Sequence, residues 1–122
     1  MSQARILFFG LTAIYLLAVI VQFFLAGLGA FGGDWDVHSG VGFVVTLGSL
    51  LLLVVAAVAR LPRRMFFVTL LLVALNALQI GLARIDVEEL AALHPVNALV
   101  IVIVAYSLMQ RSRVYLASKI AA

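Results

Sequence analysis

Four uninterrupted apolar runs constrain the fold of this chain more than any other feature. They cover about residues 6–29, 37–59, 65–84 and 95–110. Each is close to the roughly 20 residues that an α-helix needs to cross the hydrocarbon core of a bilayer. The chain has 122 residues, 66% of them hydrophobic, with a mean hydropathy of +1.28, and a soluble domain of this size could not bury so much apolar surface. The sequence therefore predicts an all-α integral membrane protein, an up-and-down four-helix bundle forming a single domain over residues 1–122.

Local signals predict where these helices begin and end. Asp36 is the expected N-cap of the second helix, and Pro62, in a basic turn, separates the second helix from the third. The stretch 86–89 has the acid-x-x-Glu pattern of a capping box, which predicts a short surface helix to about Leu93. Pro95 suits the first turn of the fourth helix, where its missing N–H is not needed. Residues 114–122 are expected to form a separate, weakly amphipathic interfacial segment.

The charged residues divide between the two ends of the predicted bundle. Seven of the eight basic residues fall on one side, namely Arg5, Arg60, Arg63, Arg64, Arg111, Arg113 and Lys119. Arg84 and all five acids fall on the other side. The positive-inside rule then places both termini in the cytoplasm and predicts a multi-pass protein of the bacterial inner (plasma) membrane. The high pI is better explained by anionic lipid headgroups than by nucleic acid, which is not an expected partner.

The two histidines are the main candidates for chemistry. His38 and His94 both lie at the outer ends of their helices, the second and the fourth. In an up-and-down bundle with short loops these helices are diagonal partners, so both imidazoles can point at the central axis. Histidine is a common axial ligand of haem iron. The spacing therefore predicts a metal site in which His38 and His94 hold one haem, with interfacial histidines that bind nothing as the alternative.

Polar and small side chains cluster at the level of the histidines. Those expected to surround the cofactor are Gln22, Gly42, Asn76, Gln79, Asn97 and Ala98. The aromatic Phe43 is expected to pack against the edge of the macrocycle, with lipid or helix contact as its alternative. Polar groups within spans are costly in lipid and usually face the bundle interior. Each has an alternative use, because polar groups also form interhelical hydrogen bonds and small residues also allow close helix packing with nothing bound. For any one of these residues, both uses stay open.

Arg84 is the only basic residue on the acidic side, at the level of the histidines. Arginine can bind a carboxylate in a bidentate fork, as a haem propionate would require. The alternatives are a pair with Asp86 or Glu88, or a position among the headgroups. Trp35 is expected to be an interfacial anchor rather than a wall of the site.

Several chemistries have no support in the sequence. Cysteine is absent, so thiolate metal sites and cysteine nucleophiles are excluded. There is no phosphate-binding glycine loop and no nucleophile elbow. Two histidines are too few for a usual zinc site.

A four-helix unit with histidines at the outer ends of its second and fourth helices resembles one half of heme A synthase, a b-type haem-binding membrane bundle. The matching residues are His38 with Gly42 a turn below, and His94 followed by Asn97. The catalytic half of that family has a glutamate three residues before the first histidine, where this chain has Trp35. The resemblance thus implies a cofactor-holding unit rather than the oxidising enzyme. The stretch 92–99 is also similar to a family of small, uncharacterised four-span bacterial membrane proteins.

These features predict a small membrane protein, similar to a b-type cytochrome, that holds one bis-histidine haem b near its outer face for electron transfer or haem handling. An electron-transfer or haem-binding protein is expected rather than a stand-alone enzyme. The expected partners are the lipid bilayer and either a larger respiratory or redox membrane complex or further copies of the chain. The alternatives are a cofactor-free accessory subunit of a membrane complex and a quinone-site protein that uses the histidines and Gln79.

Overall fold

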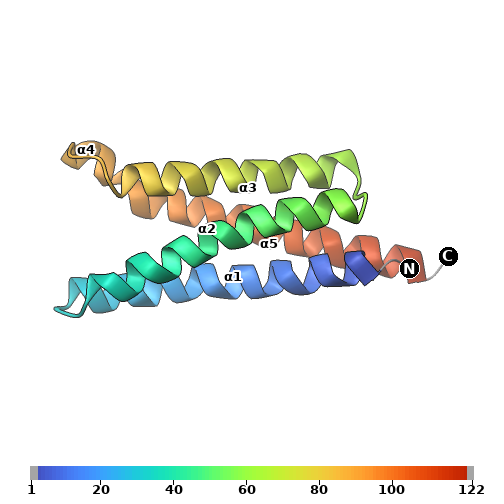
Figure 1. Cartoon of the computed structure of the whole chain (residues 1–122), viewed down its shortest axis with the longest axis horizontal. Coiled ribbons are helices and arrows are strands. Elements are labelled where there is room, and N and C mark those ends of the chain that lie inside the picture. The colour runs from blue at the N-terminus through green and yellow to red at the C-terminus, as the bar shows by residue number, and fades with distance from the viewer. Residues whose placement is uncertain (1–2, 121–122) are drawn as a thin grey trace.

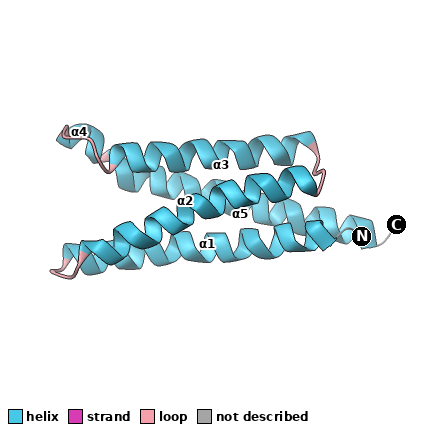
Figure 2. Ribbon diagram, viewed as in Figure 1, coloured by secondary structure: helices cyan, strands magenta, loops and turns pink. Residues whose placement is uncertain are grey.

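Four long helices make up most of the structure (Figure 2). The computed structural model describes the backbone of residues 3–120 and the side chains of residues 3–118. The elements are α1 (Gln3–Ala30), α2 (Trp35–Val58), α3 (Arg63–Leu82), the short α4 (Glu88–Ala91) and α5 (Leu93–Ile120). Four helical segments are long and apolar enough to span a membrane, the last covering Glu88–Ser118. The predicted fold class, an all-α bundle with four candidate spans, is confirmed.

The helices run alternately up and down, with both termini at one end of the bundle (Figure 1). α1 packs against α2 and α5, and α3 packs against the same two helices. α2 and α5 are therefore diagonal partners, as the short loops predict. This arrangement brings the outer ends of the two histidine-bearing helices across the bundle axis from each other.

The first two turns close the helix ends without side-chain help. After α1, Gly33 N–H donates to the Leu28 carbonyl and Gly32 N–H to the Gly29 carbonyl, the two bonds of a Schellman motif. Gly32 has a φ of +94°, which only glycine adopts without strain. The same pair of bonds follows α2, where Arg60 has a φ of 49°. The basic turn was predicted from Pro62, but its closure at Arg60 was not, because a non-glycine residue is strained in this conformation.

Two of the predicted caps are wrong. The N-cap of α2 is Asp34, whose Oδ1 accepts the backbone N–H of Asp36 at 2.7 Å. Asp36 instead lies in the first turn, where an acid is favourable because the N-terminal end of a helix carries partial positive charge. The short α4 is present as predicted, but its N-cap is Val87 and makes no side-chain bond. Glu88 and Glu89 occupy its first turn instead of completing a capping box.

The last helix is longer than predicted. Pro95 lies in the first turn of α5, as expected, but α5 then continues unbroken to Ile120 rather than ending near residue 110. Ser112 is buried, and the Arg5 guanidinium lies 5.3 Å from the centre of the Tyr115 ring. These contacts tie the helix to α1, so residues 114–120 continue a packed helix and are not a separate interfacial segment. Residues 121–122 lie outside the described residues.

The apolar core is closest-packed in the middle of the bundle and towards the termini. Four large side chains, one from each long helix, have at most 1% exposure: Phe8, Leu52, Leu72 and Leu108. Thr12 and Thr69 are also fully buried there, and each hydroxyl donates to the carbonyl four residues earlier, at 2.7 and 2.9 Å. These two hydroxyls are thus satisfied within their own helices, and large side chains fill the space between helices.

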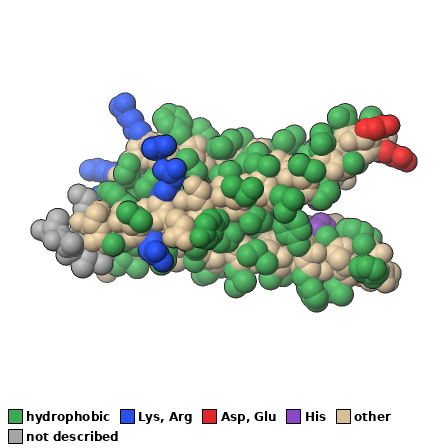
Figure 3. All heavy atoms as spheres, turned by 180° about the vertical axis from the view of Figure 1, so that it is seen from behind, with side chains coloured by type: hydrophobic (Ala, Val, Ile, Leu, Met, Phe, Trp, Pro, Cys, Tyr) green, Lys and Arg blue, Asp and Glu red, His purple; other side chains and the backbone are tan. Residues whose placement is uncertain are grey.

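Charge is segregated along the bundle axis (Figure 3). The described arginines other than Arg84 lie at the end that holds the termini, and the acids lie at the opposite end, in the α1–α2 turn and the α3–α5 connection. The Lys119 side chain lies outside the described part of the chain. We refer to these as the basic end and the acidic end. The predicted orientation, with the basic end in the cytoplasm, rests on this asymmetry.

This orientation can be tested with reporters that work only outside the cytoplasm. A periplasm-dependent reporter inserted between Gly32 and Gly33 should be active, and one inserted between Pro62 and Arg63 should be inactive, because positively charged loops stay inside. Activity of cells carrying each fusion is the measurement. The reverse pattern would contradict the orientation.

Candidate functional site

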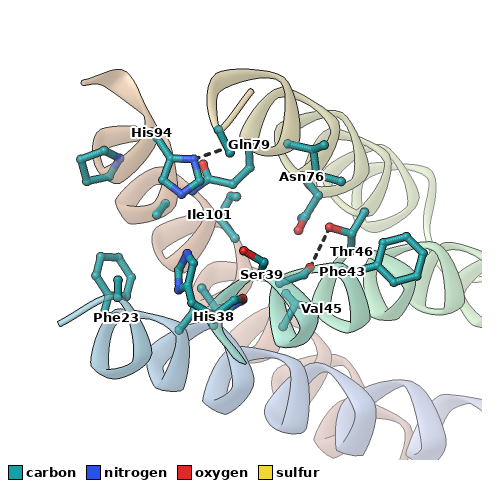
Figure 4. Close-up of a pocket in the computed structure, with 18 of the residues that line it drawn as sticks. Phe23, His38, Ser39, Phe43, Val45, Thr46, Asn76, Gln79, His94 and Ile101 are labelled. Atoms are coloured by element: carbon teal, nitrogen blue, oxygen red, sulfur yellow. Dashed lines mark hydrogen bonds between the residues drawn. The ribbon is translucent and has the colours of Figure 1, made fainter. Parts of the chain in front are cut away.

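A cavity lies between the four long helices on the acidic side of the packed core (Figure 4). Its volume is about 360 Å³, at the lower end of the range for small-molecule pockets. It is partly open to the bundle surface. Residues of α1, α2, α3 and α5 all contribute to its walls, and both histidines are among them. The site is therefore a property of the whole bundle and not of one helix pair.

His38 and His94 face each other at this cavity. Their ring centroids are 6.3 Å apart and the ring planes are inclined by 61°. His38 lies one turn into α2 and His94 in the first turn of α5, so the diagonal packing brings two chain segments 56 residues apart to one level. The prediction that the two histidines meet at one depth is confirmed.

The His94 ring is held by a hydrogen bond to the end of α3. Its Nδ1 lies 3.1 Å from the Gln79 carbonyl oxygen. A carbonyl can only accept, so Nδ1 carries the proton and Nε2 is left with a lone pair. Ligating histidines usually donate their other ring N–H in this way, which fixes the tautomer and the ring orientation. His94 is therefore preset to offer Nε2 as a ligand.

Asn97 holds Gln79 in place beside the His94 ring, on the side away from the cavity. Its Nδ2 donates to the Leu75 carbonyl at 3.0 Å and to Gln79 Oε1 at 2.6 Å. Asn97 is only 7% exposed, so both bonds are shielded from competing water. The amide thereby links α5 to α3 one turn below His94. It sets the register in which the Gln79 carbonyl meets the His94 ring.

His38 is positioned differently. Its Nδ1 is buried and has no hydrogen-bond partner within the described residues. The Trp35 ring packs edge-on against the imidazole, with centroids 5.6 Å apart. Trp35 is 50% exposed and also packs over Gly29, so it combines the predicted interfacial position with a contact to the site. A buried polar atom is costly unless it finds a partner, so this nitrogen is available to a group from outside the described residues.

Gln22 of α1 lies against the backbone of α2. Its Nε2 donates to the His38 carbonyl at 3.1 Å, and its Oε1 is buried with no partner among the described residues. A Cβ at Gly42 would lie 2.7 Å from Gln22 Nε2, so the glycine is what allows this approach. Gly40, by contrast, has open space where its Cβ would be. Of the two glycines after His38, only Gly42 shapes the site.

Asn76 lines the cavity, and Tyr15 lies behind Asn76, hydrogen-bonded to it. Asn76 Nδ2 donates to Tyr15 Oη at 2.6 Å and to the Leu72 carbonyl at 2.8 Å. Both side chains are nearly fully buried, at 3% and 4% exposure. This bond joins α3 to α1 across the bundle diagonal, where the cavity gives way to the packed core.

The cavity gathers all of the predicted site residues except Asn97. Those that line it are Gln22, His38, Gly42, Phe43, Asn76, Gln79, Arg84, His94 and Ala98. Asn97 points into the α3–α5 interface instead. Further lining residues that were not predicted include Ala26, Ser39 and Ile101. Each lies three or four residues from a predicted one (Gln22, Gly42 and Ala98), so the helical repeat could have identified them.

Phe43 and Arg84 lie at the margin of the cavity. Phe43 is 60% exposed, so one face of its ring is available to lipid. Arg84 follows the C-cap of α3 and is exposed while lining the cavity. Its guanidinium is thus placed where an anionic group emerging from the cavity would meet it.

Within the described residues, no three His, Cys, Asp or Glu side chains come together to hold a metal ion. The ligand set on offer is two imidazoles on opposite sides of a cavity. Such a pair completes the coordination of an iron that already has four equatorial nitrogens, as in haem. The donor set therefore fits a macrocyclic metal cofactor better than a bare ion.

A protein-family model matches residues 22–85, slightly more than half of the chain. The chain belongs to the DUF6220 family. DUF6220 is a family of unknown function, so membership brings no activity with it. The match includes His38 and Gln79 and ends before His94. No curated protein and no solved structure matches the chain. The membership agrees with the predicted likeness to an uncharacterised family, while the resemblance to heme A synthase stays a prediction.

The two glycines after His38 provide a matched test of this geometry. Gly40→Ala should stabilise the protein by about 0.5–1 kcal/mol, because alanine favours a helix and nothing lies near its Cβ. Gly42→Ala should show no net change in stability. The gain in helix propensity is offset because the new Cβ displaces Gln22 and breaks a hydrogen bond worth about 1 kcal/mol. Thermal unfolding in detergent, followed by circular dichroism, is the measurement. An equal rise in both variants would contradict the Gln22 contact.

Proposed function

We propose that this DUF6220 protein is a small membrane cytochrome that holds one b-type haem between His38 and His94. The observation that carries the proposal is the distance of 6.3 Å between the two imidazole centroids. Two metal–imidazole bonds of about 2 Å each, with the distance from each nitrogen to its ring centre added, span roughly 6 Å. The observed centroid distance supports the proposal because it matches this span.

The surroundings of the rings support the same cofactor. The Gln79 carbonyl orients His94 so that its Nε2 is free, and His38 has a buried ring nitrogen without a partner. Small residues, Gly42 and Ala98, leave room beside the rings. The cavity is partly open, so a macrocycle need not fit wholly within about 360 Å³. Arg84 lies at the margin, where it can bind a propionate.

The role that fits best is electron transfer. A haem supplies a one-electron couple, and two histidine ligands leave no open position for oxygen chemistry. The proposed orientation puts the site near the outer face of the bacterial inner membrane. A single site near one face cannot move an electron across the bilayer, so a redox partner, within a larger respiratory complex or in a second copy, completes the proposal. The resemblance of the histidine positions to one half of heme A synthase agrees with a cofactor-holding role.

An absorption spectrum of the detergent-purified protein tests the proposal directly. The reduced protein should show the sharp bands of six-coordinate, low-spin haem and bind little carbon monoxide, because both axial positions are filled. Ready binding of carbon monoxide would contradict the bis-histidine site. A colourless protein, even after haem is added, would favour an accessory subunit or a quinone site instead.

Substitution of each histidine assigns the ligands. His38→Ala and His94→Ala should each lose the haem or leave an open position that binds carbon monoxide, because each removes one axial ligand. Gly40→Ala is the matched control on α2, since its Cβ meets nothing, and it should keep the wild-type spectrum. Full haem content with the wild-type spectrum in both histidine variants would overturn the site.

Arg84 has a smaller expected effect. Arg84→Leu should lower the midpoint potential, because removing a nearby positive charge favours the oxidised haem. It should also increase haem loss in detergent about twofold to fivefold, since an exposed ion pair contributes at most about 1 kcal/mol. Potentiometric titration and haem retention are the measurements. Arg113→Leu, an exposed arginine at the other end, is the control, and equal effects in the two variants would remove Arg84 from the site.

A further inference from the structure

A second hollow lies at the basic end of the bundle, between the start of α3 and the end of α5. This groove has a volume of about 470 Å³ and is open to the surface. Its walls include Arg64 and Met65 of α3, and Arg111, Val114 and Tyr115 of α5. It exists because α5 continues past Arg113 and so runs alongside the beginning of α3. The groove is separate from the histidine cavity and shares no lining residue with it.

Within the described residues, no Asp or Glu lies near the positive charge at the groove. Arg64 and Arg111 line it from opposite helices, and both are exposed. All five acids of the chain lie at the other end of the bundle. Arg111 Nε donates to Ser107 Oγ at 3.3 Å, which leaves its terminal nitrogens to bind a further acceptor. Two arginines facing one hollow favour a phosphate, because the guanidinium fork matches its oxygens.

A third arginine approaches the same wall. The Arg5 guanidinium lies over the Tyr115 ring at 5.3 Å, and Tyr115 lines the groove. Arg5 Nε is buried and has no hydrogen-bond partner within the described residues. A buried N–H without an acceptor is costly. Arg5 itself does not line the groove, so it adds positive charge beside the groove without being part of the site.

The remaining walls combine the apolar Pro62, Met65 and Val114 and the Tyr115 ring with two polar residues, Gln110 and Ser118. Met65 and Val114 line the groove beside the arginines, and Val114 is 65% exposed. A soluble anion gains nothing from such surfaces, whereas a lipid places its headgroup on the arginines and its acyl chains along the spans. We propose that this groove binds one anionic glycerophospholipid, with its phosphate between Arg64 and Arg111. The proposal needs only a membrane-embedded bundle and does not depend on the haem.

Native mass spectrometry of the full chain tests this site. The protein is mixed in detergent with equal amounts of phosphatidylglycerol and phosphatidylcholine that have identical acyl chains. After release from detergent, it should retain one phosphatidylglycerol in preference to phosphatidylcholine. The double variant Arg64→Gln/Arg111→Gln should retain about 25-fold less, because each arginine near a charged headgroup contributes about a fivefold factor. Arg63→Gln/Arg113→Gln removes the same charge from the same two helices but from outside the groove. This control should retain phosphatidylglycerol within about threefold of the unmodified protein.

A second variant tests the groove without changing charge. Val114→Trp should fill the hollow and expel the lipid, and the exposed position of Val114 makes the fold tolerant of the larger ring. Equal retention of the two lipids would overturn the proposal, as would equal losses in the two double variants or full retention in Val114→Trp. Displacement of phosphatidylglycerol by an equal concentration of inorganic phosphate would also overturn it, since the groove would then be a phosphate site.

Discussion

Hydrogen bonding without water is the constraint on which the rest of the structure depends. In the hydrocarbon core each backbone N–H and C=O must find its partner within the protein, which for this chain means long helices. The first two turns end their helices with paired backbone bonds at Gly32 and Arg60. Polar side chains face the same requirement. Asn76 and Asn97 meet it by bonding across to neighbouring helices and so fix the register of the bundle.

The bundle meets this requirement differently in its two halves. Towards the termini, large apolar side chains from every long helix fill the interior, and threonine hydroxyls bond to their own helix. Towards the acidic end, amides and glycine replace the large side chains, and a cavity remains between the helices. The packed half holds the helices together, so the other half can keep a cavity between them. The proposed haem would occupy that second half.

The two histidines are not equivalent. The α3 backbone holds His94 through the Gln79 carbonyl, and Asn97 supports that contact from behind. His38 packs against Trp35 and keeps a buried nitrogen without a partner. A ring fixed by hydrogen bonding and a ring held mainly by packing differ in freedom. In the proposed haem site, His94 would therefore be the ligand that the protein orients by hydrogen bonding, and His38 the one held by packing.

The sequence by itself determined the membrane class, the four spans, the end-to-end division of charge and the two candidate ligands. These follow from hydropathy, helical period and chain order, which are local properties of the residues. Only the tertiary structure decided that α5 continues to Ile120, that Asn97 lies behind the cavity and that Arg60 closes a turn. The distance between the imidazoles and the groove at the basic end were likewise decided there. These features depend on which side chains meet across helices, and a single chain's pattern does not record those contacts.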